Sequence, residues 1–190
     1  METDASRTSP DRSDNSTPVQ YGWYLIKTYW HWPVLVGVLT YMVFQFWPPI
    51  LDLDPPGTTA PTFVHETIDG DVFDTADHAD KVMVVNVWAT WCPPCRVELP
   101  GFVDLQEEWS GRVQFVGLAT DQQGMRVIKP FAEEQGLNYP QIASGALAAR
   151  HFPGEAIPRT YVIDQNGDIR YTHTGFLPKS TLRRILQRLA

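Results

Sequence analysis

The sequence is poor in cysteine: among 190 residues only Cys92 and Cys95 occur, three positions apart. Two cysteines cannot build a disulfide-rich scaffold. A bond between residues this close closes a very short loop and removes little chain entropy, so it is poorly suited to a structural role. The pair therefore favours a working redox disulfide over a structural one.

Basic residues are also scarce, with 15 Lys and Arg against 22 Asp and Glu and a formal net charge of −7. No basic patch with interleaved aromatic residues occurs, which argues against binding of nucleic acid. The five histidines are scattered and none stands at ligand spacing to the cysteines, so we expect no metal and no cofactor. Arg96 directly follows Cys95, where covalent haem attachment requires His.

Charge is absent from one long, mainly apolar stretch, Pro33 to Leu51. As a helix rising about 1.5 Å per residue, it covers most of a hydrocarbon core about 30 Å thick, with the aromatic residues between Tyr21 and Trp32 at the interface. We therefore predict a transmembrane anchor over residues 21–51 that contacts lipid through residues 33–51. A cleaved signal peptide fits less well, because the leader is too long and no clear small-residue cleavage site follows. A buried helix of a soluble protein is the other alternative.

The flanks of this stretch differ in composition and charge. Residues 1–20 predict a disordered tail, because they have too little apolar surface to offset the entropy of ordering. Residues 52–60 are polar and rich in proline, which predicts a tether. Lys and Arg occur before the stretch, and none follows it until Lys81. The positive-inside rule then places the tail in the cytoplasm and the rest of the chain on the other side of the membrane.

Residues 61–190 carry the pattern of an α/β domain. Val82–Trp88 and Val113–Ala119 are nearly continuous apolar runs, as expected of strands buried on both faces. Pro93–Trp109 and the amphipathic segment Ser180–Leu189 predict helices. The other expected elements are a hairpin at 62–68 and 72–73, a helix at 125–135, a short strand at 141–142, a short helix at 146–151, and a hairpin at 160–163 and 169–172. This order implies a sheet with helices on both faces.

Two motifs give the domain a specific resemblance to a known family. The segments Val85 to Pro100 (VNVWATWCPPCRVELP) and Ile157 to Asp164 (IPRTYVID) are similar to signatures of the thioredoxin-like family. More narrowly, they resemble the TlpA/ResA group of membrane-anchored thiol–disulfide oxidoreductases. The resemblance covers residues 61–190. It implies an α/β thioredoxin-like fold with an N-terminal β-hairpin and a central strand–helix insertion, preceded by one transmembrane helix. It also implies a bacterial cytoplasmic membrane and a periplasmic catalytic domain.

The cysteines open the predicted helix, which gives them different roles. Cys92 stands at the helix N-terminus, where free N–H groups and the helix dipole favour its thiolate, so it is the expected nucleophile. Cys95, one turn further on, is expected to resolve the mixed disulfide. Pro93 and Pro94 lack N–H groups and withhold donors from the thiolate, which predicts a reducing couple.

Glu98 is the third expected catalytic residue. It matches an acidic residue of the ResA-like group, and the resemblance implies that it handles the Cys95 proton, with a pKa raised by partial burial. Asn86 stands where thioredoxin has a buried aspartate, so that base is missing here. The alternative interpretation of Glu98 is an ordinary solvated glutamate on a helix.

The expected client site surrounds the cysteines. Pro158 matches the family's cis-proline, which exposes the backbone of Ile157 for pairing with a client peptide. For Trp91, packing around the cysteine loop is as good an interpretation as client contact, whereas Trp88 is expected in the core. The predicted client-binding residues are therefore Trp91, Pro93, Pro94, Ile157 and Pro158.

The resemblance implies a thiol–disulfide oxidoreductase that reduces exported proteins, apocytochrome c among them, with electrons from a membrane thiol carrier. A peroxiredoxin-like peroxidase is the main rival, but its Pro-x-x-x-Thr-x-x-Cys pattern is absent, since Thr90 precedes Cys92 by only two residues. A copper-delivery module requires a Cys-x-x-x-Cys spacing, which does not occur. A tethered binding module without catalytic activity stays open, and trapping of a mixed disulfide separates it from an oxidoreductase.

Overall fold

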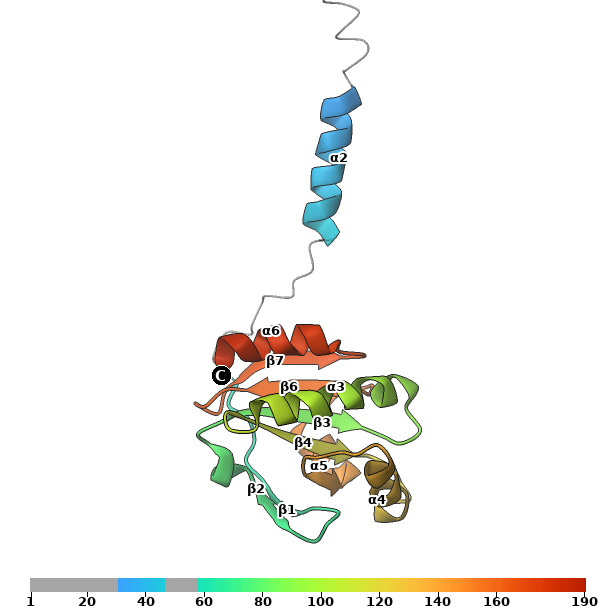
Figure 1. Cartoon of the computed structure of the whole chain (residues 1–190), viewed down its shortest axis with the longest axis vertical. Helices are drawn as coiled ribbons and strands as arrows, with labels where there is room; N and C mark the ends of the chain where they lie inside the picture. The colour runs from blue at the N-terminus through green and yellow to red at the C-terminus, as the bar shows by residue number, and fades with distance from the viewer. Residues whose placement is uncertain (1–30, 47–57) are drawn as a thin grey trace, which may run out of the picture. The chain divides into compact units, whose positions relative to one another are not determined.

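The computed structural model describes residues 31–46 and 58–190. The chain divides into two units, residues 1–49 and 50–190. The first unit contains helix α2, His31–Phe46 (Figure 1). The residues at positions 32–42 of this helix are all exposed. Within the described ranges, no helix combines the length and the apolar content needed to cross a membrane. The predicted tail, the anchor residues 21–30 and 47–51, and the tether residues 52–57 lie outside the described residues.

The second unit is built on a five-stranded mixed sheet with the order β5-β4-β3-β6-β7. β3, β4 and β5 run parallel, whereas β6 is antiparallel to β3 and β7 is antiparallel to β6. Every residue of β3 and β4 is buried, which explains their continuous apolar runs. The strands are β3 (Val82–Trp88), β4 (Val113–Ala119), β5 (Gln141–Ala143), β6 (Arg159–Ile163) and β7 (Ile169–Thr174).

Helices and a small hairpin accompany this sheet. The predicted strands and helices are present, with bounds that differ from the expected ones by no more than two residues. Gly70 supplies the positive φ of 91° in the hairpin turn. The elements are the hairpin strands β1 (Val64–Glu66) and β2 (Val72–Asp74), the 3-10 helix η1 (Thr75–His78), and helices α3 (Pro93–Trp109), α4 (Met125–Glu134), α5 (Gly145–His151) and α6 (Lys179–Leu189).

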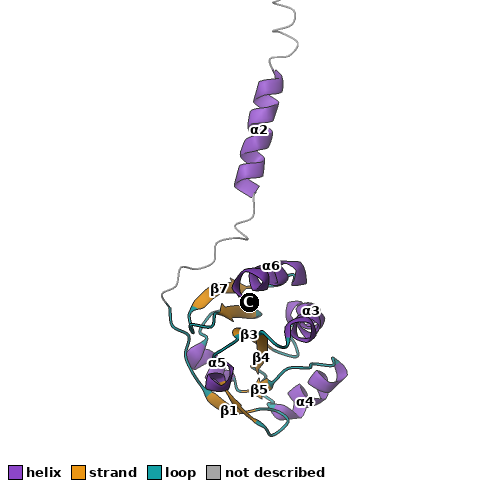
Figure 2. Ribbon diagram, turned by 60° about the vertical axis from the view of Figure 1, so that its left-hand side comes forward, coloured by secondary structure: helices purple, strands orange, loops and turns teal. Residues whose placement is uncertain are grey.

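The two faces of the sheet carry separate parts of the core. On β3, Val82 and Val84 pack with α3 and α6, whereas Val85 and Val87 pack with α5 and the β1–β2 hairpin. This alternation follows from the two-residue period of a strand. Figure 2 shows α3 and α5 on opposite sides of the sheet. The prediction of helices on both faces is therefore confirmed.

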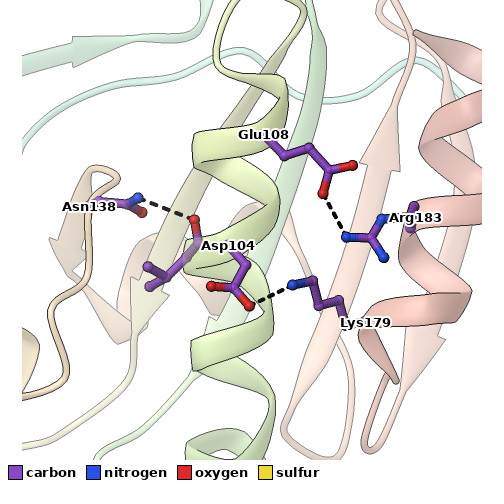
Figure 3. A network of polar contacts seen from close by, with 6 residues as sticks. Asp104, Glu108, Asn138, Lys179 and Arg183 are labelled. Atoms are coloured by element: carbon purple, nitrogen blue, oxygen red, sulfur yellow. Dashed lines mark hydrogen bonds and ion pairs between the residues drawn. The ribbon is translucent and has the colours of Figure 1, made fainter.

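Polar contacts on the surface accompany the packing of α3 against α6 (Figure 3). Lys179 Nζ lies 2.5 Å from Asp104 Oδ2, and Arg183 lies 2.6 Å from Glu108 Oε2. Asn138, in the loop before β5, donates to a backbone carbonyl of α3 at 3.1 Å. Ion pairs this exposed contribute only about 0–1 kcal/mol each, so the apolar cluster between α3, α6 and the sheet is the larger stabilising term. α3 is thus held in place, and its first turn carries the cysteines.

The folded unit includes residues that the sequence assigns to the tether. Thr59 pairs with Asp168 in an isolated antiparallel bridge. Ala60 N–H donates to the Gly167 carbonyl at 2.7 Å. Residues 58–60 therefore extend the β6–β7 hairpin region, and the boundary predicted at residue 61 is too late. The physical reason is that polar residues near a strand edge can still pair through their backbone, which a composition pattern does not reveal.

Candidate active site

The two cysteines lie at the start of α3 and are joined by a disulfide bond with Cα atoms 5.3 Å apart. Cys92 is the N-cap residue, and both cysteines are buried. Pro93 and Pro94 occupy the first helical positions, where a missing N–H sacrifices no helical hydrogen bond. The Cys95 N–H donates to Cys92 Sγ at 3.3 Å. The helix therefore retains a donor for this sulfur beyond the two prolines.

The loop after β4 holds the segment before Cys92. Thr90 donates to the carboxylate of Asp121 from its N–H at 3.1 Å and from its hydroxyl at 2.5 Å. Thr120 N–H donates to the Trp88 carbonyl at 2.9 Å. Thr120 and Asp121 follow β4, the parallel neighbour of β3, so the carboxyl ends of both strands meet here. Asp121 is not among the predicted site residues, although its position shortly after a buried strand is a signal that could have identified it.

A cis peptide bond joins Ile157 to Pro158, as the resemblance predicts. Ile157 packs against the apolar cluster that contains both cysteines. Trp91 is 64% exposed. Trp91 and Ile157 both line a groove of about 470 Å³. Trp88, in contrast, is fully buried, and its Nε1 donates to Gln141 Oε1 at 3.0 Å.

Arg159 shapes one wall of this groove and is not among the predicted site residues. Its buried guanidinium donates to the carbonyls of Phe152 at 2.9 Å and Ala156 at 2.6 Å. A Cβ atom at Gly154 would lie 2.6 Å from Arg159 Cδ, so glycine is required for this close approach. These contacts hold the loop between α5 and β6, which leads into the cis peptide bond.

Glu98 lies one helical turn after Cys95, and residues three apart on a helix are neighbours. Its side chain is buried, at 2% exposure. Oε1 accepts a hydrogen bond from Asn86 Nδ2 at 2.9 Å, and Oε2 accepts one from Leu177 N–H at 3.2 Å. The alternative interpretation of Glu98 as a solvated side chain is therefore wrong. The sequence separations of 12 and 79 residues explain why no local pattern predicts these partners.

Burial raises the pKa of Glu98 to about 7, although the hydrogen bonds from Leu177 and Asn86 act to lower it. Desolvation is the larger effect because the carboxylate has left water and has gained only two neutral donors. A carboxyl group with this pKa exchanges its proton close to neutral pH, where a general acid or base is most effective. The site thus holds a proton acceptor one turn from the second cysteine.

The described histidines lie in other surroundings. His78 stacks on the Phe73 ring with centroids 5.0 Å apart, and His151 lies 6.3 Å from the Phe63 ring. Burial lowers the pKa of His78, assisted by the charge of Lys81. Among residues 31–46 and 58–190, no group of three or more His, Cys, Asp or Glu side chains is arranged to hold a metal ion.

The fold and the CxxC site together place the protein in the thioredoxin-fold class of dithiol–disulfide proteins. Comparison with known proteins shows which family within this class the chain belongs to. The Redoxin family model matches residues 55–187, and the chain belongs to that family.

The names of similar proteins refer to the same thiol–disulfide or thioredoxin-like chemistry. The chain is 29% identical over 133 residues to the thiol-disulfide oxidoreductase ResA of Geobacillus thermodenitrificans, covering 69% of this chain and 76% of ResA. It is 28% identical over 132 residues to the thioredoxin-like protein YneN of Bacillus subtilis, covering 68% of this chain and 78% of YneN. A solved thiol:disulfide interchange protein from Chlorobium tepidum is 34% identical, with a TM-score of 0.67 over 72% of this chain and 98% of that one. The resemblance to ResA-type proteins is confirmed, and the protein is a protein-disulfide oxidoreductase.

Proposed function

We propose that the protein reduces disulfide bonds of exported proteins, from an anchor in the bacterial cytoplasmic membrane, by exchange through Cys92 and Cys95. The observation that carries this proposal is the buried cysteine pair at the start of α3, with the buried carboxyl of Glu98 one turn away. The ResA-type relatives support the reaction class. The direction of electron flow, the clients and the anchor are the parts that experiments must test.

The reaction proceeds by two sulfur exchanges. The Cys92 thiolate attacks a client disulfide, forms a mixed disulfide and releases the second client sulfur, which takes a proton from water. Cys95 then gives its proton to Glu98 and attacks Cys92 Sγ, so that the first client sulfur leaves and takes up that proton. The client gains two electrons and two protons, and the protein is left with the Cys92–Cys95 disulfide.

Glu98 accepts a proton in the second exchange, in which Cys95 attacks Cys92. Cys95 is fully buried, so its thiol has little access to water as a proton acceptor. The Glu98 carboxyl, with its pKa raised by burial to about 7, is partly ionised at neutral pH and is able to accept this proton. In the reverse direction the neutral carboxyl returns it.

The client lies against the groove beside the cysteines. Trp91 and Ile157 offer apolar contact there. The Ile157 backbone, next to Pro158, pairs with an extended client segment as an added strand. Pro93 and Pro94 are exposed beside Cys92 and contact the client on the other side of the reacting sulfur.

The first turn of α3 supports the reducing direction. The two prolines remove N–H donors that would otherwise stabilise the Cys92 thiolate, and a less stabilised thiolate makes the dithiol a better reductant. Electrons then come from a membrane thiol carrier, and the haem-site cysteines of apocytochrome c are a fitting client class. We expect a reduction potential below about −250 mV, whereas a value near −120 mV is typical of an oxidant.

The anchor proposal rests on composition. Pro33 to Leu51 contains no charged residue, and helix α2 (His31–Phe46) covers residues 33–46 of this region. Lys and Arg precede the region, and none follows before Lys81. The positive-inside rule then leaves the catalytic domain on the periplasmic side.

Trapping of mixed disulfides tests the reaction. The Cys95→Ser variant cannot resolve the mixed disulfide, so it should accumulate client adducts that reductant removes. The Cys92→Ser variant is the matched control and should accumulate none. Adduct formation that is equal in both variants, or a potential near −120 mV for the Cys92–Cys95 pair, would contradict the proposal.

A further inference from the structure

The side-chain amide of Asn86 is only half satisfied. Asn86 lies in the middle of β3 and is fully buried. Its Nδ2 donates to Glu98 Oε1 at 2.9 Å and lies 3.5 Å from Thr160 Oγ1. Its Oδ1 is buried and has no hydrogen-bond partner among the described residues. A buried carbonyl oxygen without a donor is unfavourable, so this orphan acceptor calls for a physical reason.

The partners of Nδ2 are groups that can reverse their roles. A carboxyl group accepts when ionised and donates when protonated, and the Thr160 hydroxyl can do either. Leu177 N–H, on the other oxygen of Glu98, can only donate. A proton on Glu98 is therefore better placed on Oε1, which faces Asn86, than on Oε2, which faces the N–H group.

We propose that the Asn86 amide turns over when Glu98 takes up a proton, so that Oδ1 replaces Nδ2 and accepts a hydrogen bond from the protonated Oε1 of Glu98. The exchange of positions is a half-turn about the last side-chain bond, because the two ends of the amide have nearly the same shape. One end of the amide stays without a partner in either orientation, and the end that faces Glu98 and Thr160 is the one that changes its role. The Thr160 hydroxyl then donates to Oδ1 instead of accepting from Nδ2. Asn86 is thus a positioning residue that gives Glu98 a matched partner in both protonation states.

This inference deepens the proton-transfer role proposed for Glu98 and rests on it. Two other titratable groups bear on Glu98. Burial, together with the charge of Glu98, raises the pKa of Tyr139, which therefore stays neutral throughout the relevant pH range. Cys95, on the same helix, does not titrate while it is in the disulfide. In the oxidised protein, a titration near neutral pH at this site consequently belongs to Glu98.

Nuclear magnetic resonance of the oxidised full chain in detergent micelles tests the turnover. The Glu98 carboxyl carbon should titrate between pH 5 and pH 9, and the side-chain NH₂ signals of Asn86 should shift with the same midpoint. Above the midpoint, the NH₂ protons should show Overhauser contacts to the Glu98 side chain, and these contacts should be lost below it. Asn86 signals and contacts that do not change while Glu98 titrates would overturn the turnover and leave the proposed function intact.

The variant Asn86→Leu gives an independent readout. If Asn86 serves both states of Glu98, its loss lowers the melting temperature at pH 5 as well as at pH 9. If Asn86 only donates to the carboxylate, the loss of melting temperature is confined to high pH, which would overturn the inference. Gln114→Leu removes another buried amide, one that donates to the Phe115 carbonyl, and is the matched control. If the Asn86→Leu variant does not fold, the magnetic resonance spectra of the unaltered chain test the inference by themselves.

If Glu98 shows no titration between pH 5 and pH 9, the inference and the proton role of Glu98 both fail. The cysteine chemistry is tested separately by the mixed-disulfide trap, so failure of the turnover and failure of the proposed function are distinguishable.

Discussion

The pKa of Glu98 is set by two opposing effects, hydrogen bonding and removal from water. Its two oxygens accept hydrogen bonds from Asn86 and Leu177, which favour the charged form. Removal from water disfavours the charged form more strongly, so the pKa rises to about 7. The cost of keeping this charge inside the protein is the physical basis for a proton acceptor that also releases its proton readily.

A pH-dependent stability follows from this residue. A carboxyl with a raised pKa in the folded state contributes stability that is fully present below about pH 4.5 and is lost as the pH rises through about 7. At about 1.4 kcal/mol per pKa unit, the loss amounts to about 3 kcal/mol. Urea unfolding of the oxidised chain at pH 4.5 and pH 8 should show this loss, whereas Glu98→Gln should not. A stability difference between the two proteins that is constant with pH would contradict the assignment.

At the scale of elements, the site depends on the ends of two parallel strands. β3 and β4 end at Trp88 and Ala119, which are paired in register. The chain leaves β3 into the cysteine loop and leaves β4 toward Asp121. The hydrogen bonds from Thr90 to Asp121 join these two exits. Strand pairing thus sets where α3 begins, and through this the position of Cys92.

Asp121 is therefore expected to matter for both stability and rate. Asp121→Ala leaves the partly buried Thr90 N–H and hydroxyl without their acceptor, which should cost about 1–3 kcal/mol in unfolding free energy. It should also slow disulfide exchange, because the loop before Cys92 loses its support. Asp121→Asn keeps one acceptor oxygen and should lose less of both. Chemical denaturation and an insulin-reduction assay measure the two effects, and equal behaviour of the Ala and Asn variants would argue against an anchoring role.

At the scale of the whole molecule, the chain consists of two units of different character. Residues 58–190 form the domain that carries the site, and α2 belongs to the other unit. The sequence as a whole carries a formal charge of −7, whereas the stretch from Pro33 to Leu51 contains no charged residue. The first unit is proposed to fix the location of the chemistry, and the second unit performs it.

Anchoring can be tested with charges placed in α2. An Asp at the centre of a membrane helix costs about 2.5–3.5 kcal/mol on insertion scales. Val36→Asp combined with Leu39→Asp should release the chain from membranes under alkaline extraction, while the exchange activity stays unchanged. The same two positions changed to Ala form the control and should remain bound. Release of the unaltered chain under these conditions would disprove the anchor.

Several parts of the fold could be predicted because their signals are local. The bounds of β3, α3 and β4 agree with the sequence prediction, since two buried strands give continuous apolar runs and prolines mark a helix start. The pairing order of the strands and the inclusion of residues 58–60 could not be read in this way. Both depend on backbone hydrogen bonds between segments that are distant in the chain.

The sequence by itself determined the chemistry of this protein: two thiols of fixed spacing at the start of a helix, which only a redox pair explains well. Only the tertiary structure decided how the proton is handled. Asn86, Glu98 and Leu177 come from a strand, a helix and a loop, and they meet because the sheet and α3 enclose them together. Burial and hydrogen bonding at one point in space set the pKa of a carboxyl group, and neither is a property of neighbouring residues in the sequence.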